Sequence, residues 1–176
     1  RSYAISSATE HDETMRRPAT DLLIIAFGNE LRGDDGAAHH VVHLLEADSR
    51  FQGLVIETHQ LTPDLAEAVA SSRVVCFVDA RIADGDGSVS VTRIEAEFAA
   101  PASLGHTMSP EELLTVARVL YSGAPQAWLI GIPSESFELG APLSETALTG
   151  VSAAVRAIRT IASSVLSAPD EGLCTS

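Results

Sequence analysis

The sequence predicts an α/β fold: a single three-layer domain with a mostly parallel, twisted sheet of about five strands flanked by helices. Three observations lead to this prediction. Continuous apolar runs recur along the chain, which is typical of strands buried on both faces of a parallel sheet. Segments with helical periodicity and capping signals lie between these runs. No internal repeat and no second apolar core divide the 176 residues.

Four apolar runs and one alternating segment predict the strands. The runs cover residues 22–27, 54–56, 74–78 and 127–132. Val89, Val91 and Ile94 alternate with polar residues after a turn-rich Asp-Gly segment, which predicts one further strand near an edge of the sheet. The strand order 2-1-3 is the usual arrangement for the first three strands of such a fold.

Apolar periodicity and capping signals predict four helices, three between the strands and one after the last strand. Residues 37–47 carry apolar side chains on one side. Thr62 and Pro63 supply an N-cap and a first-turn proline for the second helix. Ser109-Pro110-Glu111-Glu112 is a capping box that opens the third helix, and Ser144 caps a last helix that runs from residue 145 to about 165.

Both ends of the chain differ in composition from the middle. Residues 1–20 are polar and lack periodicity, so we expect a disordered leader, with the α/β domain over residues 21–167 and a flexible tail over 168–176. The chain lacks an apolar run long enough to span a bilayer and a signal-peptide pattern, and its two cysteines form no disulfide framework. We therefore expect a cytoplasmic protein, not held to a membrane, and a monomer.

The charge pattern excludes several classes of function. The formal charge is −13, and every one of the 11 basic residues is Arg. Such a chain is a poor ligand for nucleic acid or for anionic lipid. The absence of lysine excludes Schiff-base enzymes, P-loop enzymes and receiver domains, because each needs a lysine ammonium in its site.

Acidic side chains follow two of the predicted strands. Asp34 and Asp35 lie in the loop after the first strand, and Asp79 follows the third. With strand order 2-1-3 these carboxylates converge on one crevice at the carboxyl edge of the sheet. Crowded carboxylates repel one another, so we expect a counter-charge, either an Arg such as Arg32 or Arg81 or a metal ion. His106, just before the third helix, would complete an open set of ligands for Ni²⁺, Zn²⁺ or Fe²⁺.

Four motifs in this order resemble the nickel–iron hydrogenase maturation endopeptidases. They are Gly28-Asn29-x-Leu31-x-Gly33-Asp34-Asp35-Gly36, Val78-Asp79-Ala80, Gly105-His106-x-Met108-Ser109-Pro110-Glu111 and Leu129-Ile130-Gly131-Ile132-x-x-Glu135-Ser136. The resemblance extends from Leu22 to about Ala162. The first motif is distinctive, the second is weak alone, and the four together are specific.

The resemblance implies a function and a set of site residues. The family removes a short C-terminal peptide from a hydrogenase large-subunit precursor after nickel insertion, so the implied partner is that precursor. The implied nickel belongs to the substrate, and no organic cofactor is expected. Carried over by motif, the metal contacts are Asp35, Asp79 and His106, and the two acids are the catalytic residues. Asp34, Asn29 and His59 are auxiliary candidates, and whether the metal or a carboxylate-activated water performs the cleavage stays open.

Other candidates have plainer interpretations. His39 and His43 share a helix face with the i,i+4 spacing of a metal pair, but a solvated helix edge is the commoner arrangement, and we assign it to them and to His40. Cys76 is expected to be a small core residue. Two other functions are kept: a non-catalytic nickel-binding accessory protein, and a receiver-like signalling domain, which the absence of lysine disfavours.

Overall fold

Five strands form one mixed sheet in the order β2-β1-β3-β5-β4. The computed structural model describes residues 20–83, 87–97 and 108–166. The strands are β1 (Thr20–Phe27), β2 (Leu54–Thr58), β3 (Ser72–Ile82), β4 (Ser90–Ile94) and β5 (Gln126–Ser134). β1, β2, β3 and β5 are parallel, and only β4 is antiparallel, paired with β5 at the edge. The predicted sheet, its 2-1-3 order and its edge strand are therefore confirmed.

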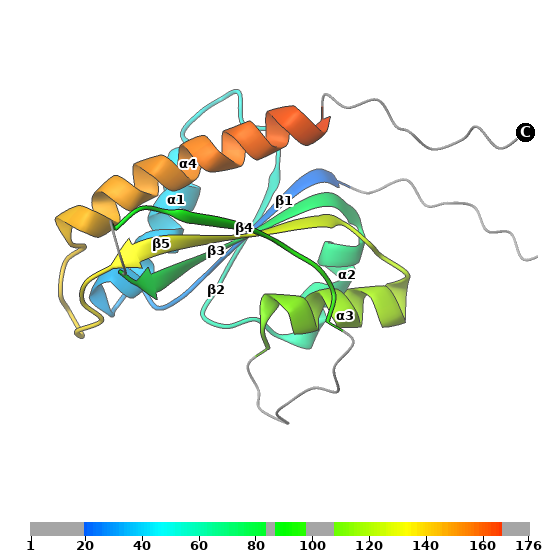
Figure 1. The fold of residues 1–176 in the computed structure, drawn as a ribbon, viewed down its shortest axis with the longest axis horizontal. Coiled ribbons are helices and arrows are strands. Elements are labelled where there is room, and N and C mark those ends of the chain that lie inside the picture. Colours follow the sequence, from blue (N-terminus) through cyan, green and yellow to red (C-terminus); the bar gives the residue numbers. More distant parts are fainter. Residues whose placement is uncertain (1–19, 84–86, 98–107, 167–176) are drawn as a thin grey trace, which may run out of the picture.

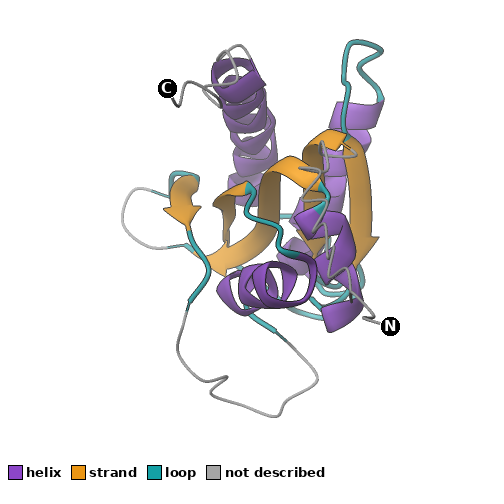
Figure 2. Ribbon diagram, turned by 90° about the vertical axis from the view of Figure 1, so that its right-hand side faces the viewer, coloured by secondary structure: helices purple, strands orange, loops and turns teal. Residues whose placement is uncertain are grey.

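Helices cover both faces of the sheet (Figures 1 and 2). The α-helices are α1 (Ala37–Glu46), α2 (Ala66–Ala70), α3 (Pro110–Tyr121) and α4 (Glu145–Leu166), and short 3₁₀ helices precede two of them, η1 (Gly33–Gly36) and η2 (Pro63–Leu65). α1 and α4 pack on one face, and α2 and α3 pack on the other. Within the described ranges, no helix combines the length and the apolar character needed to cross a bilayer.

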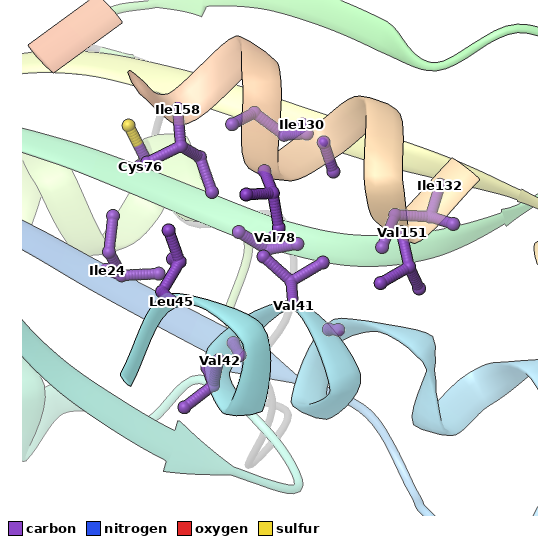
Figure 3. Packing of buried hydrophobic residues seen from close by; sticks show 14 of the residues in the cluster. Ile24, Val41, Val42, Leu45, Cys76, Val78, Ile130, Ile132, Val151 and Ile158 are labelled. Atoms are coloured by element: carbon purple, nitrogen blue, oxygen red, sulfur yellow. The ribbon is translucent and has the colours of Figure 1, made fainter. Parts of the chain in front are cut away.

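Alternate residues of the central strands enter two apolar clusters. Ile24, Cys76, Val78 and Ile130 face α1 and α4, as Figure 3 shows, while neighbouring residues such as Phe77 face α2 and α3. Successive side chains of a strand point to opposite faces, so a strand covered by helices on both sides is apolar throughout. This explains why the runs in the sequence are continuous. The same burial raises the pKa of the Cys76 thiol to about 12, which agrees with its expected role as a core residue.

The capping signals act as predicted at two helices. Ser109 Oγ accepts a hydrogen bond from the backbone N–H of Glu112, and the Glu112 carboxylate accepts one from the N–H of Ser109, which completes the capping box. Ser144 Oγ accepts from the N–H of Ala147 at the start of α4. Each bond satisfies a backbone donor that has no partner inside its helix.

β2, β3 and β5 end beyond their predicted ends, and β1, β3 and β5 begin one or two residues before their predicted starts. β3 runs to Ile82 beside β5, whereas its pairing with β1 stops at Val78. Asp79 therefore lies within β3, where that strand loses β1 as a neighbour, and not after the strand as predicted. Thr20 belongs to β1, and its N–H donates to Ser71 O. The rest of the expected leader and all of the expected tail lie outside the described residues.

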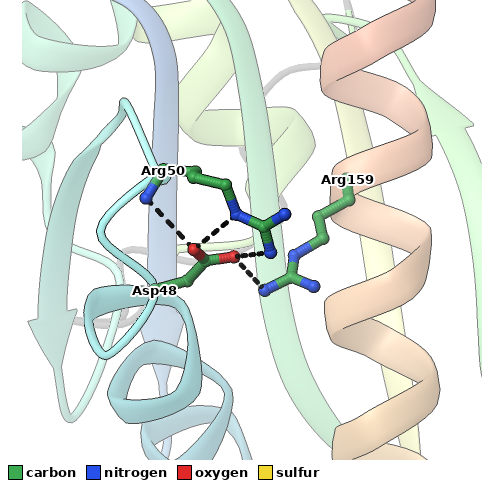
Figure 4. Close-up of polar contacts among 3 residues, drawn as sticks. All are labelled: Asp48, Arg50 and Arg159. Atoms are coloured by element: carbon green, nitrogen blue, oxygen red, sulfur yellow. Dashed lines mark hydrogen bonds and ion pairs between the residues drawn. The ribbon is translucent and has the colours of Figure 1, made fainter.

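An acid and two arginines join α1 to α4 at the edge of the sheet where β1 begins (Figure 4). Asp48, two residues after the end of α1, accepts from Arg50 Nε at 3.0 Å and from Arg159 Nη2 at 2.7 Å. The hydrogen bonds from Arg50 and the charges of both arginines hold the pKa of Asp48 at about 2. Both arginines are largely exposed, so solvent screens this cluster, and its effect on stability is small.

The end of α3 offers a stability prediction. A Cβ on Gly123 would lie 2.3 Å from Ala70 Cα in α2, so Gly123→Ala should lower the free energy of unfolding by roughly 2 kcal/mol through overpacking. The adjacent Ser122 has φ 58, in the left-handed region, and Ser122→Gly should raise that free energy by about 1 kcal/mol. Urea unfolding of both variants measures the two changes. Equal effects of the two substitutions on the free energy of unfolding would show that Ala70 in α2 does not lie this close to residue 123 after α3.

Candidate functional site

The first loop of the site follows β1. Hydrogen bonds between its own side chains and its own backbone N–H groups hold it in place. Asn29 Oδ1 accepts from Leu31 N–H at 3.0 Å, and the N–H of Asn29 donates to Asp35 Oδ2 at the same distance. Gly28 has φ +141, and a Cβ there would lie 2.2 Å from the carbonyl oxygen of Asp35, so only glycine fits at this position. The loop therefore holds the Asp35 carboxylate at the carboxyl end of β1.

Asp34 points in a different direction from Asp35 and joins the first loop to the segment after β5. Its fully buried carboxylate accepts from the N–H and hydroxyl of Ser144 at 2.6 and 2.8 Å, and from the N–H groups of Glu135 and Ser136 at 2.7 and 3.2 Å. Burial alone would raise the pKa of Asp34, but these hydrogen bonds outweigh burial, and the pKa lies below its ordinary value. A carboxylate offers about four acceptor positions, so four donors leave little capacity for a metal.

Asp79 lies in β3 where the β1–β3 pair ends, beside the η1 segment that carries Asp35. Its Oδ1 accepts from the N–H of Ala80 at 2.8 Å. Burial raises the pKa of Asp79 to about 6, the hydrogen bond from Ala80 opposes that rise, and the negative charge of Asp35 adds to it. The η1 segment that carries Asp35 packs against β3, so the two carboxylates belong to adjoining elements. An acid with this pKa can accept or donate a proton near neutral pH.

The other predicted site residues are separated from this pair or lie outside the described ranges. His106 falls in residues 98–107, which the structure does not describe; Met108 nearby donates its N–H to Leu61 O. His59 is exposed after the end of β2. Among the described residues, no three His, Cys, Asp or Glu side chains form a group that could hold a metal ion. The three-ligand site therefore stays a prediction, with Asp35 and Asp79 as its described members.

Both arginines near the acids contact backbone or hydroxyl oxygens. Arg32 Nε donates to the carbonyl oxygen of Phe137 at 3.3 Å, which adds a second link between the first loop and the segment after β5. Arg81 Nε donates to Ser90 Oγ at 3.0 Å, and its Nη2 donates to Ser88 O, so this side chain reaches across β5 toward β4. These contacts give each guanidinium a structural role in its loop.

His39 is a residue that sequence reasoning misplaced. It was expected on a solvated helix edge, but it is 5% exposed, and its ring nitrogens contact Glu57 Oε2 and Gly28 O. His40 and His43 are exposed, as expected. The sequence does contain an indication that His39 is buried, because it lies beside Ala38 and Val42 in the apolar stripe of α1. The partner on β2 is 18 positions away, so local periodicity could not identify it.

Comparison with known proteins identifies the fold. No protein-family model and no curated protein sequence matches the chain. Among solved structures, it is similar to the hydrogenase maturating endopeptidase HybD from Escherichia coli, with TM-score 0.64 and 19% identity over 82% of this chain and 93% of that one. It is also similar to the hydrogenase 2 maturation peptidase from a Thaumarchaeota archaeon, with TM-score 0.58 and 25% identity over 80% and 97%.

A third similar structure is the [NiFe] hydrogenase maturation protease HycI from Thermococcus kodakarensis, with TM-score 0.59 and 20% identity over 84% of this chain and 93% of that one. The described α/β sheet with its flanking helices is therefore the fold of these endopeptidases. Their names agree with the family that the four sequence motifs resemble.

Asp34→Asn should destabilise the fold at neutral pH. The amide keeps one acceptor oxygen and turns an NH₂ group toward backbone donors, so the loss should be roughly 2–3 kcal/mol. Because the folded-state pKa is depressed, the contribution of Asp34 is present above 3.8 and is lost as pH falls through the folded pKa. Urea unfolding from pH 7 to pH 3 should show the difference from wild type shrinking. The exposed Asp64→Asn serves as the control, and the same loss there would refute the role of Asp34.

Asp79→Asn should have the opposite effect. The pKa of Asp79 rises from 3.8 unfolded to about 6 folded, so its contribution to stability is complete below 3.8 and is lost as pH rises through 6. The variant should therefore exceed wild type in stability above pH 7, by up to about 3 kcal/mol, and match it below pH 4. Thermal or urea unfolding across this range measures the difference. A gap that does not change with pH would contradict the raised pKa.

Proposed function

We propose that this chain, which has the fold of the hydrogenase maturation endopeptidases, is itself a processing endopeptidase that removes the C-terminal peptide of a nickel–iron hydrogenase large-subunit precursor. One observation carries the proposal. η1, which carries Asp35, packs against β3, which carries Asp79, at the carboxyl edge of β1 and β3, and the charge of Asp35 contributes to the raised pKa of Asp79. Ligands of open α/β sheets bind at this edge.

In the proposed reaction, the two carboxylates contact the nickel ion that the precursor carries. A divalent cation would relieve their mutual repulsion, and carboxylate oxygens together with an imidazole suit nickel. We assign the imidazole to His106, following the sequence motif. The nickel is part of the substrate, so the isolated protein needs no resident cofactor for recognition.

The chain itself supplies positioning and a proton acceptor. The N–H of Asn29 holds Oδ2 of Asp35, which leaves Oδ1 as the oxygen for the substrate metal. The raised pKa of Asp79, about 6, suits a carboxylate that takes a proton from an attacking water molecule. Recognition of nickel and activation of water are two roles for this pair, and loading the precursor with nickel distinguishes them.

Two exposed leucines support a protein as the substrate. Leu31 is 68% exposed and Leu139 is 79% exposed, and they lie on the two loops that Asp34 joins. The N–H of Gly140 donates to Leu31 O at 2.8 Å, so the loops run together beside the acids. Exposed apolar side chains that gather beside a site are typical of surfaces that bind another protein segment.

The proposal includes a monomeric enzyme in the cytoplasm. The buried thiol of Cys76 is free, which fits a reducing compartment. The acidic charge of −13 favours a protein partner with a cationic centre over nucleic acid.

The test is cleavage of a purified precursor, with and without nickel, followed by mass spectrometry of the released peptide. Wild type should process the nickel-loaded precursor only. Asp35→Asn, Asp79→Asn and His106→Ala should each reduce the rate by a factor of about 100 or more, because each removes a contact to the reacting centre. The exposed Asp64→Asn is the matched control and should process at the wild-type rate.

Two outcomes would contradict the proposal. If Asp35→Asn cleaves as fast as wild type, the site is wrong. If the protein binds nickel tightly but cleaves no precursor, it is a nickel-binding accessory protein.

A further inference from the structure

His39 lies behind the acid pair and connects two strands to the first loop. It belongs to α1 and is 5% exposed. Its Nδ1 lies 2.6 Å from Oε2 of Glu57, near the end of β2, and its Nε2 lies 3.2 Å from the carbonyl oxygen of Gly28, directly after β1. The functional site described above makes no use of this imidazole.

The two partners of His39 determine which protons the ring must carry. A backbone carbonyl only accepts hydrogen bonds, and an ionised carboxylate only accepts them as well. Nε2 therefore carries the proton that it donates to Gly28 O, and Nδ1 lies 2.6 Å from Glu57 Oε2.

The Gly28–Asn29 peptide group connects His39 to Asp35. Its carbonyl oxygen accepts from His39 Nε2, and its N–H donates to Asp35 Oδ2 at 3.0 Å. A hydrogen bond to the carbonyl polarises the amide and strengthens its N–H as a donor. The neighbouring N–H of Gly28 donates to Thr58 O. The backbone of Asp35 packs so closely on Gly28 that a Cβ would not fit there, and this close packing keeps the peptide in place.

We propose that His39, held by Glu57, is a positioning residue for Asp35. It fixes the Gly28–Asn29 peptide so that one carboxylate oxygen of Asp35 is bound to the backbone and the other faces the substrate. The inference rests on the proposed function, because Asp35 is the residue that receives the substrate.

The first experiment is NMR on the isolated full chain at pH 7, which requires no substrate. In wild type, Nε2 of His39 should show the ¹⁵N shift of a protonated nitrogen, because the carbonyl of Gly28 only accepts. In His39→Leu the amide proton of Asn29 should move upfield, because its donor bond to Asp35 weakens. His39→Gln keeps a neutral donor and should give a smaller shift. His40→Gln, on the exposed neighbour, should leave the Asn29 amide unchanged.

The second experiment measures processing of the nickel-loaded precursor. His39→Leu should reduce kcat about 10- to 100-fold, the range typical of residues that orient a metal contact, with little change in KM. Glu57→Gln should reduce kcat by a smaller factor; its side chain is 37% exposed, so this variant tests the pair without opening the core. Thermal unfolding of each variant shows that the measured chains are folded.

The outcomes separate this inference from the proposed function. If wild type cleaves no precursor, the proposed function fails, while the NMR result still decides the role of His39. An unprotonated Nε2 of His39 in wild type, or an Asn29 amide unmoved in a folded His39→Leu variant, would overturn the inference. A loss of stability in His39→Leu with normal kcat would also overturn it, because the role would then be structural only.

Discussion

The buried carboxylate of Asp34 holds together the edge of the sheet at which the site lies. Its four donors come from the segment between β5 and α4, more than 100 positions along the chain. Removal of a carboxylate from water is unfavourable unless hydrogen bonds replace the lost hydration. These bonds therefore favour one position of the first loop against the start of α4. Asn29 and Asp35 belong to that loop, so their positions depend on the same bonds.

Two adjacent aspartates thus perform different tasks, and this division depends on tertiary contacts. The sequence shows Asp34 and Asp35 as an equivalent pair after a buried strand. The donors after β5, from Glu135, Ser136 and Ser144, determine which acid turns inward, and Ser144 also caps α4. Asp79 has the opposite effect on the stability of the fold. Its raised pKa destabilises the folded chain at neutral pH, and such a cost is common where a charge is kept for chemistry rather than for stability.

Much of the fold could be predicted from local sequence, because the determinants are local. Continuous apolar runs identify β1, β3 and β5, and Ser109 and Ser144 mark the helix starts. The length of β3 could not be predicted, because residues beyond Val78 are strand only through their pairing with β5. His39 was misplaced for a similar reason, since Glu57 and Gly28 meet it only in the folded chain. The prediction that Asp79 lies near Asp35 rests on strand order alone.

The direction of the outermost described elements has a consequence for the face that carries the acids. β1 begins at Thr20 and runs toward the acids, whereas α4 begins beside Asp34 and runs away from them for 22 residues, about 33 Å (Figure 1). Both described ends of the chain are therefore at the amino edge of the sheet. The described ends, Thr20 and Leu166, therefore lie away from the loops that carry Asp35 and Leu31, and neither of them crosses that face of the molecule.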